Sequence, residues 1–319
     1  MGKSNPMTGK PVFVLGSFVV SCSAKVARFP RPGESLAAET VTIEPGGKGL
    51  NQAIMARRLG AAVEGLLAVG DDLAAAFAPP ALERAGLPQS MLVRLDGATG
   101  SGIGFTDASG ETCLAVASGA NLALTAAHVR QRAPAIAAAA LVTAQFEIGD
   151  APIEAAFTLA RQAGIPTLLN PSPFRPIPAA ILALTSILII NETEARGLAA
   201  ALGREQDEAT DPDRFARELG PALLKHGPRL VVLTRGAAGA VAVTADAPTI
   251  VQADFPVEAI DSLGAGDAFA TTLGVRLAMG LALPEALRDA AAAGALTTTR
   301  HGVFEALPTA DAIALMSGR

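Results

Sequence analysis

The sequence predicts an α/β fold with a doubly wound, mostly parallel sheet that is flanked by helices and carries a small β-sheet lid. Short runs of Val, Ile and Leu alternate along the chain with longer stretches rich in Ala and Leu, and this alternation is typical of buried parallel strands connected by helices. Two segments depart from it and have the composition of exposed strands and turns. The 319 residues contain no low-complexity linker, so we expect one domain over residues 1–319.

The elements of the main sheet follow from the spacing of apolar residues. Strands are expected where Val, Ile and Leu follow one another without polar alternation, at Val12–Phe18, Val63–Val69, Ala139–Gln145, Thr167–Asn170, Ile187–Ile190 and Leu230–Thr234. Helices are expected between them, at Gly49–Leu59, Ala151–Ala163, Glu192–Ala201 and Asp213–Lys225. Parallel pairing is favoured because a helix between two strands returns the chain to the same edge of the sheet.

The small sheet is expected from residues 19–45 and 98–118. Arg28–Glu44 is interrupted by proline and glycine and then becomes strand-like. Gly102–Thr106 and Thr112–Ala117 flank the turn Asp107-Ala-Ser-Gly110, which has Gly where a hairpin needs a positive φ. These segments lie far apart in the sequence, and we expect them to pair as a lid beside the α/β body.

Composition excludes several classes of function. The net charge is −5 without runs of Lys or Arg, which disfavours nucleic-acid binding because that needs a basic face. The uncharged stretches Ala133–Phe146 and Pro176–Asn191 are shorter than the ~20 apolar residues of a membrane span. The two cysteines and three histidines have no metal-ligand spacing. We expect a cytoplasmic protein with a frayed N-terminal tail, because the N-terminus has no cleavage signature.

One glycine motif has the composition of a catalytic anion hole. Asp261-Ser-Leu-Gly264-Ala265-Gly266-Asp267-Ala-Phe269 leads into a helical stretch. Two glycines at a helix start let backbone N–H groups point into one concavity, where they attract an anion. Asp267, in the first turn, would accept a proton from a hydroxyl while the amides stabilise a phosphoryl group. The alternative is a glycine-rich turn with Asp267 as an ordinary helix-start residue.

A second glycine motif is Pro45-Gly-Gly-Lys48-Gly-Leu-Asn51-Gln52. It differs from a Walker loop, which needs Ser or Thr after Lys. Glycines that let the backbone approach a ligand, together with the amide of Asn51, suit a polyhydroxyl compound. The alternative is a tight loop with Lys48 in solvent. Neither glycine motif has the spacing of a dinucleotide fingerprint.

Two shorter motifs directly follow predicted strands, where ligands bind in α/β sheets. Asn191-Glu-Thr-Glu194 could order water around a magnesium ion, or could be a capping box with Asn191 as N-cap. Thr234-Arg-Gly236-Ala-Ala-Gly239 suits a loop near a nucleotide, or a plain hairpin turn into Ala240–Thr244.

Together these motifs resemble the ribokinase family, the PfkB-type carbohydrate kinases. Gly46–Gln52 is similar to the first family signature, and Asp261–Phe269 is similar to the second. The resemblance extends from Val12 to Pro308, and further segments fall in the family's order: Thr99-Gly100, Gly119–Asn121, Asn170–Pro173, Asn191–Glu194 and Thr234–Gly236.

The resemblance implies a ribokinase-like fold and ATP-dependent phosphorylation of a sugar hydroxyl. Asp267 would be the general base, and Gly264, Ala265 and Gly266 would form the anion hole. The sugar would contact residues of the first signature, the lid and the strand ending at Gln145, namely Gly47, Lys48, Asn51, Ser21 and Glu147.

The same resemblance implies where the nucleotide and the metal ions bind. Asn191 and Glu194 would serve the magnesium–phosphate region, with Glu194 holding Mg²⁺ through water, and Thr234, Gly236 and Gly239 would line the ATP. A monovalent cation such as K⁺ would be held by Asp261, Leu263 and carbonyls of Thr298–Val303. Ala306 stands where a family Ser hydroxyl contributes.

One departure from the family bears on the substrate. Ribose-type members have Gly-Ser-x-Asn-x-Asp after the first strand, and here Val19 and Ser21 replace the Asn and the Asp. That Asp makes charge-assisted hydrogen bonds to sugar hydroxyls, so ribose is a doubtful substrate. A less hydroxylated, acidic or modified sugar, or a nucleoside, fits the change.

We therefore predict that the protein transfers the γ-phosphoryl group of MgATP to a hydroxymethyl group of a sugar or sugar derivative. The alternatives are a nucleoside kinase of the same fold and a sugar-binding protein without catalysis. A nicotinamide-dependent dehydrogenase is less favoured, because an early glycine fingerprint is lacking. The apolar face of the lid is expected to pair two chains as a homodimer.

Overall fold

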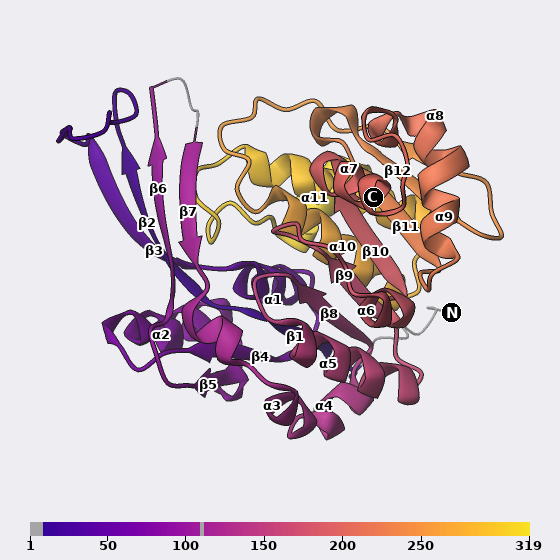
Figure 1. Ribbon diagram of the computed structural model, residues 1–319, viewed down its shortest axis with the longest axis horizontal. Helices are drawn as coiled ribbons and strands as arrows, with labels where there is room; N and C mark the ends of the chain where they lie inside the picture. Colours follow the sequence, from indigo (N-terminus) through magenta and orange to yellow (C-terminus); the bar gives the residue numbers. More distant parts are fainter. Residues whose placement is uncertain (1–8, 109–111) are drawn as a thin grey trace.

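Two sheets organise the computed structural model, which describes residues 9–108 and 112–319. The large sheet has the strand order β13-β12-β11-β10-β9-β8-β1-β4-β5 (Figure 1). Neighbouring strands from β11 to β5 in this order pair in parallel. Strand β12 pairs antiparallel with β11, and β13 pairs antiparallel with β12. The strands are β1 (Val12–Ser17), β4 (Val63–Val69), β5 (Leu92–Arg94), β8 (Leu141–Gln145), β9 (Thr167–Asn170), β10 (Ile187–Asn191), β11 (Leu230–Thr234), β12 (Ala240–Thr244) and β13 (Ile250–Gln252).

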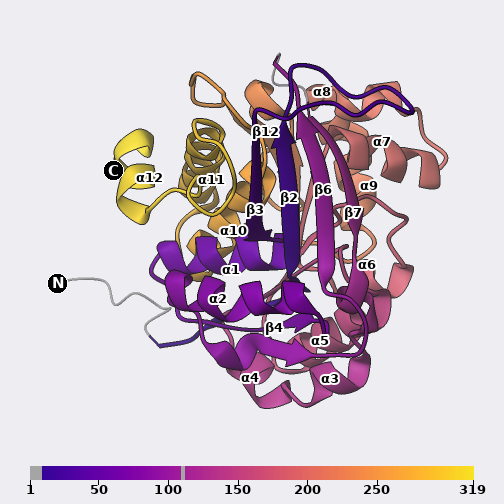
Figure 2. The ribbon, with the colours of Figure 1, turned by 90° about the vertical axis from the view of Figure 1, so that its left-hand side faces the viewer.

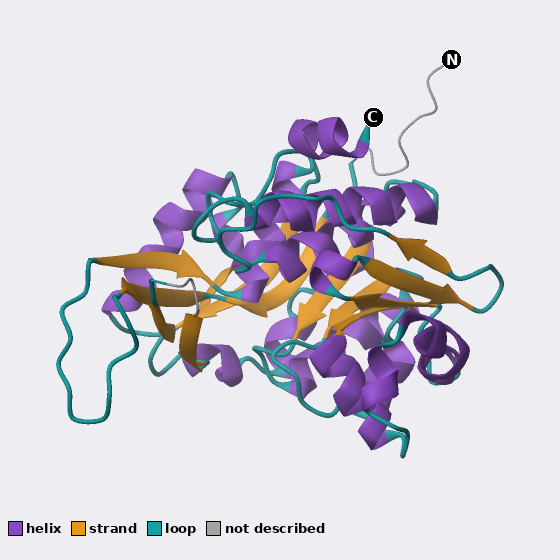
Figure 3. Ribbon diagram, turned by 90° about the horizontal axis from the view of Figure 1, so that it is seen from above, coloured by secondary structure: helices purple, strands orange, loops and turns teal. Residues whose placement is uncertain are grey.

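Helices cover both faces of the large sheet, as Figure 3 shows from above. Alternate residues of β1 belong to two separate cores: Val12 and Val14 pack on one side, Phe13 and Leu15 on the other. The first core includes α1 (Lys48–Arg58), α2 (Ala78–Ala85), α10 (Ala265–Ala278), α11 (Leu283–Thr298) and α12 (Ala310–Ser317). The second includes α3 (Ala126–Arg130), α4 (Ala133–Ala138), α5 (Asp150–Gln162), α6 (Ala179–Leu184), α7 (Glu192–Ala201) and α9 (Gly220–Leu224). The predicted doubly wound sheet is confirmed.

The helix predicted over Asp213–Lys225 is present, but it contains a π-helical turn that the sequence pattern did not predict. The segment divides into α8 (Pro212–Arg214), a π-helical turn at Phe215–Leu219, and α9. Pro221 lies in the first turn of α9. A proline inside a helix cannot donate to the preceding turn and its ring crowds that turn, so the regular helix is interrupted just before it.

The small sheet has the order β3-β2-β6-β7. Its strands are β2 (Val19–Lys25), β3 (Thr40–Gly46), β6 (Gly100–Thr106) and β7 (Thr112–Ala117), and Figure 2 shows them side by side in front of the rest of the chain. The strand predicted after the proline- and glycine-containing part of Arg28–Glu44 is present as β3. The predicted turn at 107–110 lies partly outside the described residues, and the predicted N-terminal tail lies outside them up to residue 8.

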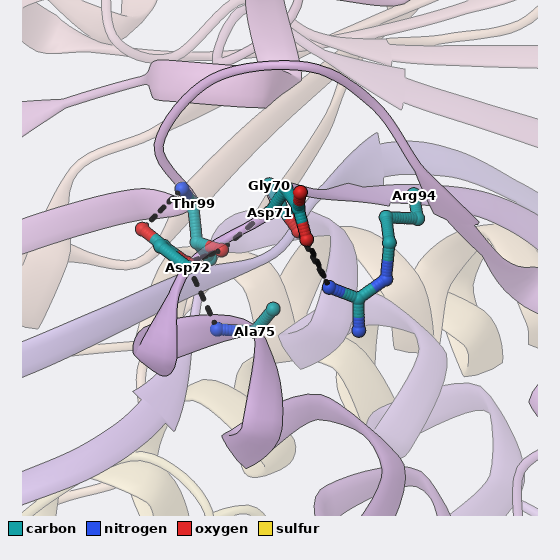
Figure 4. Close-up of polar contacts among 6 residues, drawn as sticks. All are labelled: Gly70, Asp71, Asp72, Ala75, Arg94 and Thr99. Carbon is teal, nitrogen blue, oxygen red and sulfur yellow. Dashed lines mark hydrogen bonds and ion pairs between the residues drawn. The ribbon is translucent and has the colours of Figure 1, made fainter.

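The strand register assigns the side chains of the small sheet to its two faces. Ile43 pairs with Cys22, which pairs with Ile103 across the middle strands, so these side chains share one face. Val41, Ile43 and Ile103 on that face are 59%, 55% and 60% exposed. The other face carries Ser21 and the buried Gly102. A cluster of bonds joins the start of β6 to the end of β4 (Figure 4): Thr99 N–H and Oγ1 donate to Asp72 at 2.9 and 2.6 Å.

Within the described residues, no helix has the length and apolar character needed to cross a membrane.

Candidate active site

Helix α10 begins beside open space. Its N-cap, Gly264, has a φ of +78°, a conformation that favours glycine. A Cβ atom on Gly264 would lie 2.8 Å from Cγ1 of Val303, whereas a Cβ on Gly266 would meet nothing within 4 Å. The first N–H groups of a helix lack helical partners and attract negative charge. The start of α10 can therefore accept an anion beside Gly266.

Asp267 lies in the first turn of α10 and is only 3% exposed. Its Oδ2 accepts a 2.8 Å hydrogen bond from Nδ2 of Asn51, and its Oδ1 has no hydrogen-bond partner. Burial raises the pKa of Asp267, while the positive charge of Lys48 and the bond from Asn51 oppose that rise. A buried carboxylate with one free oxygen can accept a proton from a hydroxyl placed against it.

Helix α1 brings Asn51 and Lys48 to the same place. Gly47, its N-cap, has a φ of +99°, and a Cβ on Gly49 would lie 2.3 Å from the backbone nitrogen of Ser17. The glycines thus let the start of α1 press against the end of β1. The pKa of the half-buried Lys48 is raised chiefly by the charge of Asp267, with Glu147 adding to it and burial opposing it.

Glu147 follows β8 and closes this cluster from a third element. Its Oε2 accepts hydrogen bonds from Ser17 Oγ at 2.5 Å and from the backbone N–H of Lys48 at 2.9 Å. The Oγ of Ser17 also accepts from the N–H of Gly49 at 3.2 Å. The ends of β1 and β8 and the start of α1 therefore meet around one carboxylate.

Asn191 and Glu194 form the predicted capping box at the start of α7. Oδ1 of Asn191 accepts from the N–H of Glu194 at 2.9 Å, and Oε2 of Glu194 accepts from the N–H of Asn191 at 2.9 Å. Oε1 of Glu194 accepts from Asn191 Nδ2 at 3.1 Å. Burial raises the pKa of Glu194 to about 7, against the lowering effects of the bond from Asn191, the charge of Lys48 and the hydroxyl of Ser172.

The hydrogen bonds of the capping box limit how Glu194 could bind a magnesium ion. Both oxygens of Glu194 already accept hydrogen bonds from Asn191, and the described residues contain no group of three or more His, Cys, Asp or Glu that could hold a metal. Magnesium characteristically keeps several waters and binds substrate phosphates with one or two carboxylates. The residues present fit an ion of that kind, held mainly by phosphate and water near Glu194.

The segment Thr234–Gly239 lies at the same edge of the sheet. Thr234 pairs with Asn191 in the parallel register of β11 and β10, and its Oγ1 donates to the carbonyl of Ile190 at 3.3 Å. The chain then makes a 3-10 turn at Gly236–Ala238 and returns as β12. Gly239 has a φ of +85°, and a Cβ there would lie 2.1 Å from the carbonyl oxygen of Gln252. The hairpin turn into Ala240–Thr244, which was the alternative for this motif, is present, and a nucleotide-binding role for it stays a prediction.

The side chain of Asp261 connects two loop segments through hydrogen bonds from main-chain N–H groups. Its Oδ1 accepts from the N–H of Leu263 at 3.0 Å and its Oδ2 from the N–H of Gly302 at 3.1 Å. Ala306 is buried and brings no hydroxyl. The monovalent-cation site at Asp261 and Leu263 and activation by potassium stay predictions of the family resemblance.

Ser21 lies apart from the cluster, on β2 of the small sheet beside Gly102, whose Cβ would lie 3.4 Å from Ser21 Oγ. Sequence reasoning missed Ser172, whose hydroxyl lowers the pKa of Glu194, although the Asn-Pro-Ser-Pro motif at 170–173 was a signal. It also missed Arg175, which contacts the loop around Glu147 and which no motif marked.

Comparison with known proteins shows the family to which the chain belongs. The sequence profile described as pfkB family carbohydrate kinase matches residues 10–310. A ribokinase of Staphylococcus aureus is 31% identical over 310 residues, which cover 96% of this chain and 99% of that protein. A bifunctional ribokinase/ribose-5-phosphate isomerase A of Fructilactobacillus sanfranciscensis is 31% identical over 307 residues, which cover 95% of this chain and 55% of that longer protein.

Among solved structures, Arabidopsis thaliana ribokinase complexed with ribose and ATP matches with a TM-score of 0.87 at 24% identity, over 97% of this chain and 99% of that one. This likeness shows the fold. The profile match includes both glycine motifs, which form the starts of α1 and α10. The chain belongs to the pfkB family of carbohydrate kinases, and it is a ribokinase-family sugar kinase, a phosphotransferase that acts on a sugar hydroxyl group.

Proposed function

We propose that the protein transfers the γ-phosphoryl group of MgATP to a hydroxymethyl group of a sugar or sugar derivative, with Asp267 as the general base. The observation that carries this proposal is the free Oδ1 of Asp267, buried at the start of α10 beside the open space at Gly266. A proton acceptor and an anion-binding helix start are thereby placed within one turn of helix. Phosphoryl transfer needs both of them.

The residues around Asp267 have separate tasks in the proposed reaction. Asn51 holds Oδ2 by its 2.8 Å bond, which leaves Oδ1 to take the proton of the attacking hydroxyl. The hydroxyl oxygen bonds to the γ-phosphorus as the bond from that phosphorus to the bridging oxygen breaks and ADP leaves. The N–H groups of Gly264, Ala265 and Gly266 stabilise the charge on the transferring group. Lys48 adds a positive charge between the carboxylates, and Glu147 binds a hydroxyl of the sugar.

The nucleotide is proposed to lie along the edge formed by Asn191, Thr234, Gly236 and Gly239. Magnesium, when bound, supplies positive charge to the phosphates, and Glu194 would hold it through water. Use of ATP also suggests that the protein works in the cytoplasm.

The small sheet is proposed to act as a lid over the sugar within a single domain. Closing it excludes water, which would otherwise take the phosphoryl group. Its outer face exposes Val41, Ile43 and Ile103, and we propose that a second copy of the chain covers this face in a homodimer. Such contiguous apolar area is typical of an interface.

The substrate is proposed to have fewer hydroxyls to be bound by the lid than ribose has. Ser21, on the inner face of the small sheet beside Gly102, brings no charge, and Val19 brings no polar group. The lid residues at these two positions cannot make a charge-assisted bond to a sugar diol.

The test is a coupled ADP-release assay with MgATP on pentoses, deoxypentoses, hexoses, sugar acids and nucleosides, using the Asp267→Asn variant as the control for background hydrolysis. We expect one sugar class to give turnover that the variant loses. Preference for a nucleoside would replace the substrate class, and binding of a sugar without phosphate transfer would contradict the proposal. Repeating the assay in sodium and potassium salts tests cation activation.

A further inference from the structure

We propose that Arg175 is a positioning residue that fixes the loop carrying Glu147, and so sets the affinity for the sugar. The inference rests on the proposed function, in which Glu147 contacts the sugar. Arg175 lies after β9, 28 residues beyond Glu147 in the sequence, and belongs to none of the motifs of the family resemblance.

The guanidinium of Arg175 contacts both neighbours of Glu147. Its Nη2 donates a 3.0 Å hydrogen bond to the carbonyl oxygen of Ile148, and its Cζ lies 3.9 Å from the centre of the Phe146 ring. Its Nη1 makes an ion pair with Asp150, the first residue of α5. The planar fork of arginine can stack on a ring and donate in its own plane at once, which lysine cannot do.

A main-chain hydrogen bond also restrains the loop that carries Glu147. The N–H of Phe146 donates to the carbonyl of Ser172 at 3.0 Å, so the segment bearing Arg175 is bonded to the loop at a second point. Phe146 is 4% exposed and Ile148 is fully buried. With both neighbours held, the orientation of the Glu147 side chain between them is restricted, and its Oε2 meets Ser17 Oγ and the Lys48 N–H.

Most of the effect of Arg175 on the orientation of Glu147 is expected from its hydrogen bond to the Ile148 carbonyl and its contact with the Phe146 ring. The side chains of Arg175 and Asp150 are 32% and 44% exposed, and ion pairs at such exposure contribute little. The contacts to Ile148 and Phe146 lie on buried residues, where a lost partner is costly. Without Arg175, Glu147 would sample more orientations, and its own hydrogen bonds would open more often.

The experiment compares Arg175→Ala with Arg161→Ala. Arg161 is a matched control, because it also donates from Nη1 to a main-chain carbonyl, that of Ala183, at 2.7 Å, but at a place without contact to the Glu147 loop. We expect Arg175→Ala to raise the sugar KM about tenfold, with kcat and the ATP KM changed less than about twofold. Arg161→Ala should leave all three near the wild-type values.

Combination with Glu147→Gln separates positioning from general destabilisation. If Arg175 acts through Glu147, Arg175→Ala should raise the sugar KM by less than about twofold in the Glu147→Gln background. Equal effects in both backgrounds, or parallel loss of kcat and affinity for both substrates, would overturn the inference. If Glu147→Gln raises the sugar KM and Arg175→Ala does not, the inference fails while the proposed function stands.

A second measurement does not depend on turnover. The N–H of Lys48 donates to Glu147, so Arg175→Ala should speed hydrogen exchange at this amide, and Arg161→Ala should not. Unchanged exchange at Lys48 would overturn the inference whatever the substrate. Absence of sugar-dependent turnover in the wild type would contradict the proposed function, and the exchange rates would then decide the positioning of Glu147 by themselves.

Discussion

Asn51 and Asp267 lie 216 residues apart in the sequence and are joined by a 2.8 Å hydrogen bond from Nδ2 to Oδ2. The bond connects the first turn of α1 to the first turn of α10, which pack side by side in one core. It uses one carboxylate oxygen and leaves the other without a partner. The two helices together therefore fix the direction in which the proposed base faces.

Replacing Asp267 with Asn should separate activity from stability. The amide can still accept the bond from Asn51 but cannot take a proton, so turnover should fall by about 10²- to 10⁴-fold. Burial raises the pKa of Asp267 in the folded state. The wild-type protein is therefore stabilised at low pH, where the carboxyl is protonated, and loses this stability as pH rises through the raised pKa. The variant should therefore melt at or above the wild-type temperature at neutral pH.

The check is a set of thermal melts from acid to neutral pH, together with steady-state turnover. The stability advantage of the variant should shrink as the pH is lowered, because the wild-type carboxyl then becomes protonated. Near-wild-type turnover would contradict the role of the base, and an advantage independent of pH would contradict the burial argument.

The dependence of rate on pH should respond to Lys48. Asp267 must be ionised to act, so kcat/KM should rise with pH through its pKa. Lys48 lowers the pKa of Asp267 and also that of Glu194. Lys48→Met should therefore move the acid limb of the plot of kcat/KM against pH to higher pH, whichever of the two carboxyls determines that limb.

A suitable control for this prediction is Lys25→Met on the small sheet. Lys25 is exposed and pairs with Glu39 at 3.1 Å, so its loss removes the same charge without touching the cluster. The acid limb should stay in place in that variant. A limb that moves to lower pH in Lys48→Met would contradict the assigned electrostatics.

The sequence determines much of this fold through local patterns. The capping box at Asn191 and Glu194 and the strand before it were predictable because their bonds are made within three residues. The π-helical turn at Phe215–Leu219 was not, since it depends on how the segment before Pro221 adapts to a missing donor. A proline marks where a regular helix is stressed, but not whether the chain bends, widens or stops.

The site itself was predicted as a set of residues rather than as an arrangement. Asn51, Glu147 and Asp267 carried recognisable motifs or positions, but their bonds join distant segments and have no local signal. Arg175 shows the limit most clearly. An arginine in a proline-rich loop resembles a solvated surface residue, and only the packing of β8 against β9 places it beside Phe146.

The two glycines at the start of α10 should differ in what they contribute. Gly264→Ala forces a side chain into a positive φ and to 2.8 Å from Cγ1 of Val303, so it should cost about 1–2 kcal/mol of stability. Gly266→Ala meets open space in a helical position and should leave stability equal or higher. Its methyl group, however, would occupy the proposed phosphoryl site.

Chemical denaturation and ATP kinetics measured on the same two variants distinguish these effects. Gly266→Ala should lower kcat/KM for ATP with no loss of stability. If Gly266→Ala keeps full activity, the open space beside it is not the place where the phosphoryl group transfers.

The outer face of the small sheet should control the oligomeric state. Ile103 is 60% exposed at its centre, and Ile103→Glu should convert the proposed dimer to a monomer because a charge would be buried in the interface. Val251→Glu is the control, since Val251 is 64% exposed on the edge strand β13 of the other sheet. Light scattering over a range of concentrations measures both. A wild-type mass of one chain at every concentration would contradict the dimer.

The base of the small sheet should depend on the hydroxyl of Thr99 (Figure 4). That hydroxyl donates to Asp72 at 2.6 Å and accepts from the buried N–H of Gly70 at 2.9 Å. Thr99 is 2% exposed, so Thr99→Val keeps the shape but leaves the Gly70 N–H unpaired, at a cost of about 1–3 kcal/mol. Thr99→Ser keeps the hydroxyl and should lose less.

The bonds from Thr99 also lower the pKa of Asp72. A carboxyl whose folded pKa is lowered contributes stability above its unfolded pKa and loses it as pH falls through the folded pKa. The share of the Thr99→Val loss that passes through Asp72 should therefore diminish in acid, while the share from Gly70 persists. Denaturant titrations at neutral and acid pH measure the two shares of the lost stability. Equal stability of Thr99→Val and the wild type at neutral pH would show that the small sheet is held in place by other contacts.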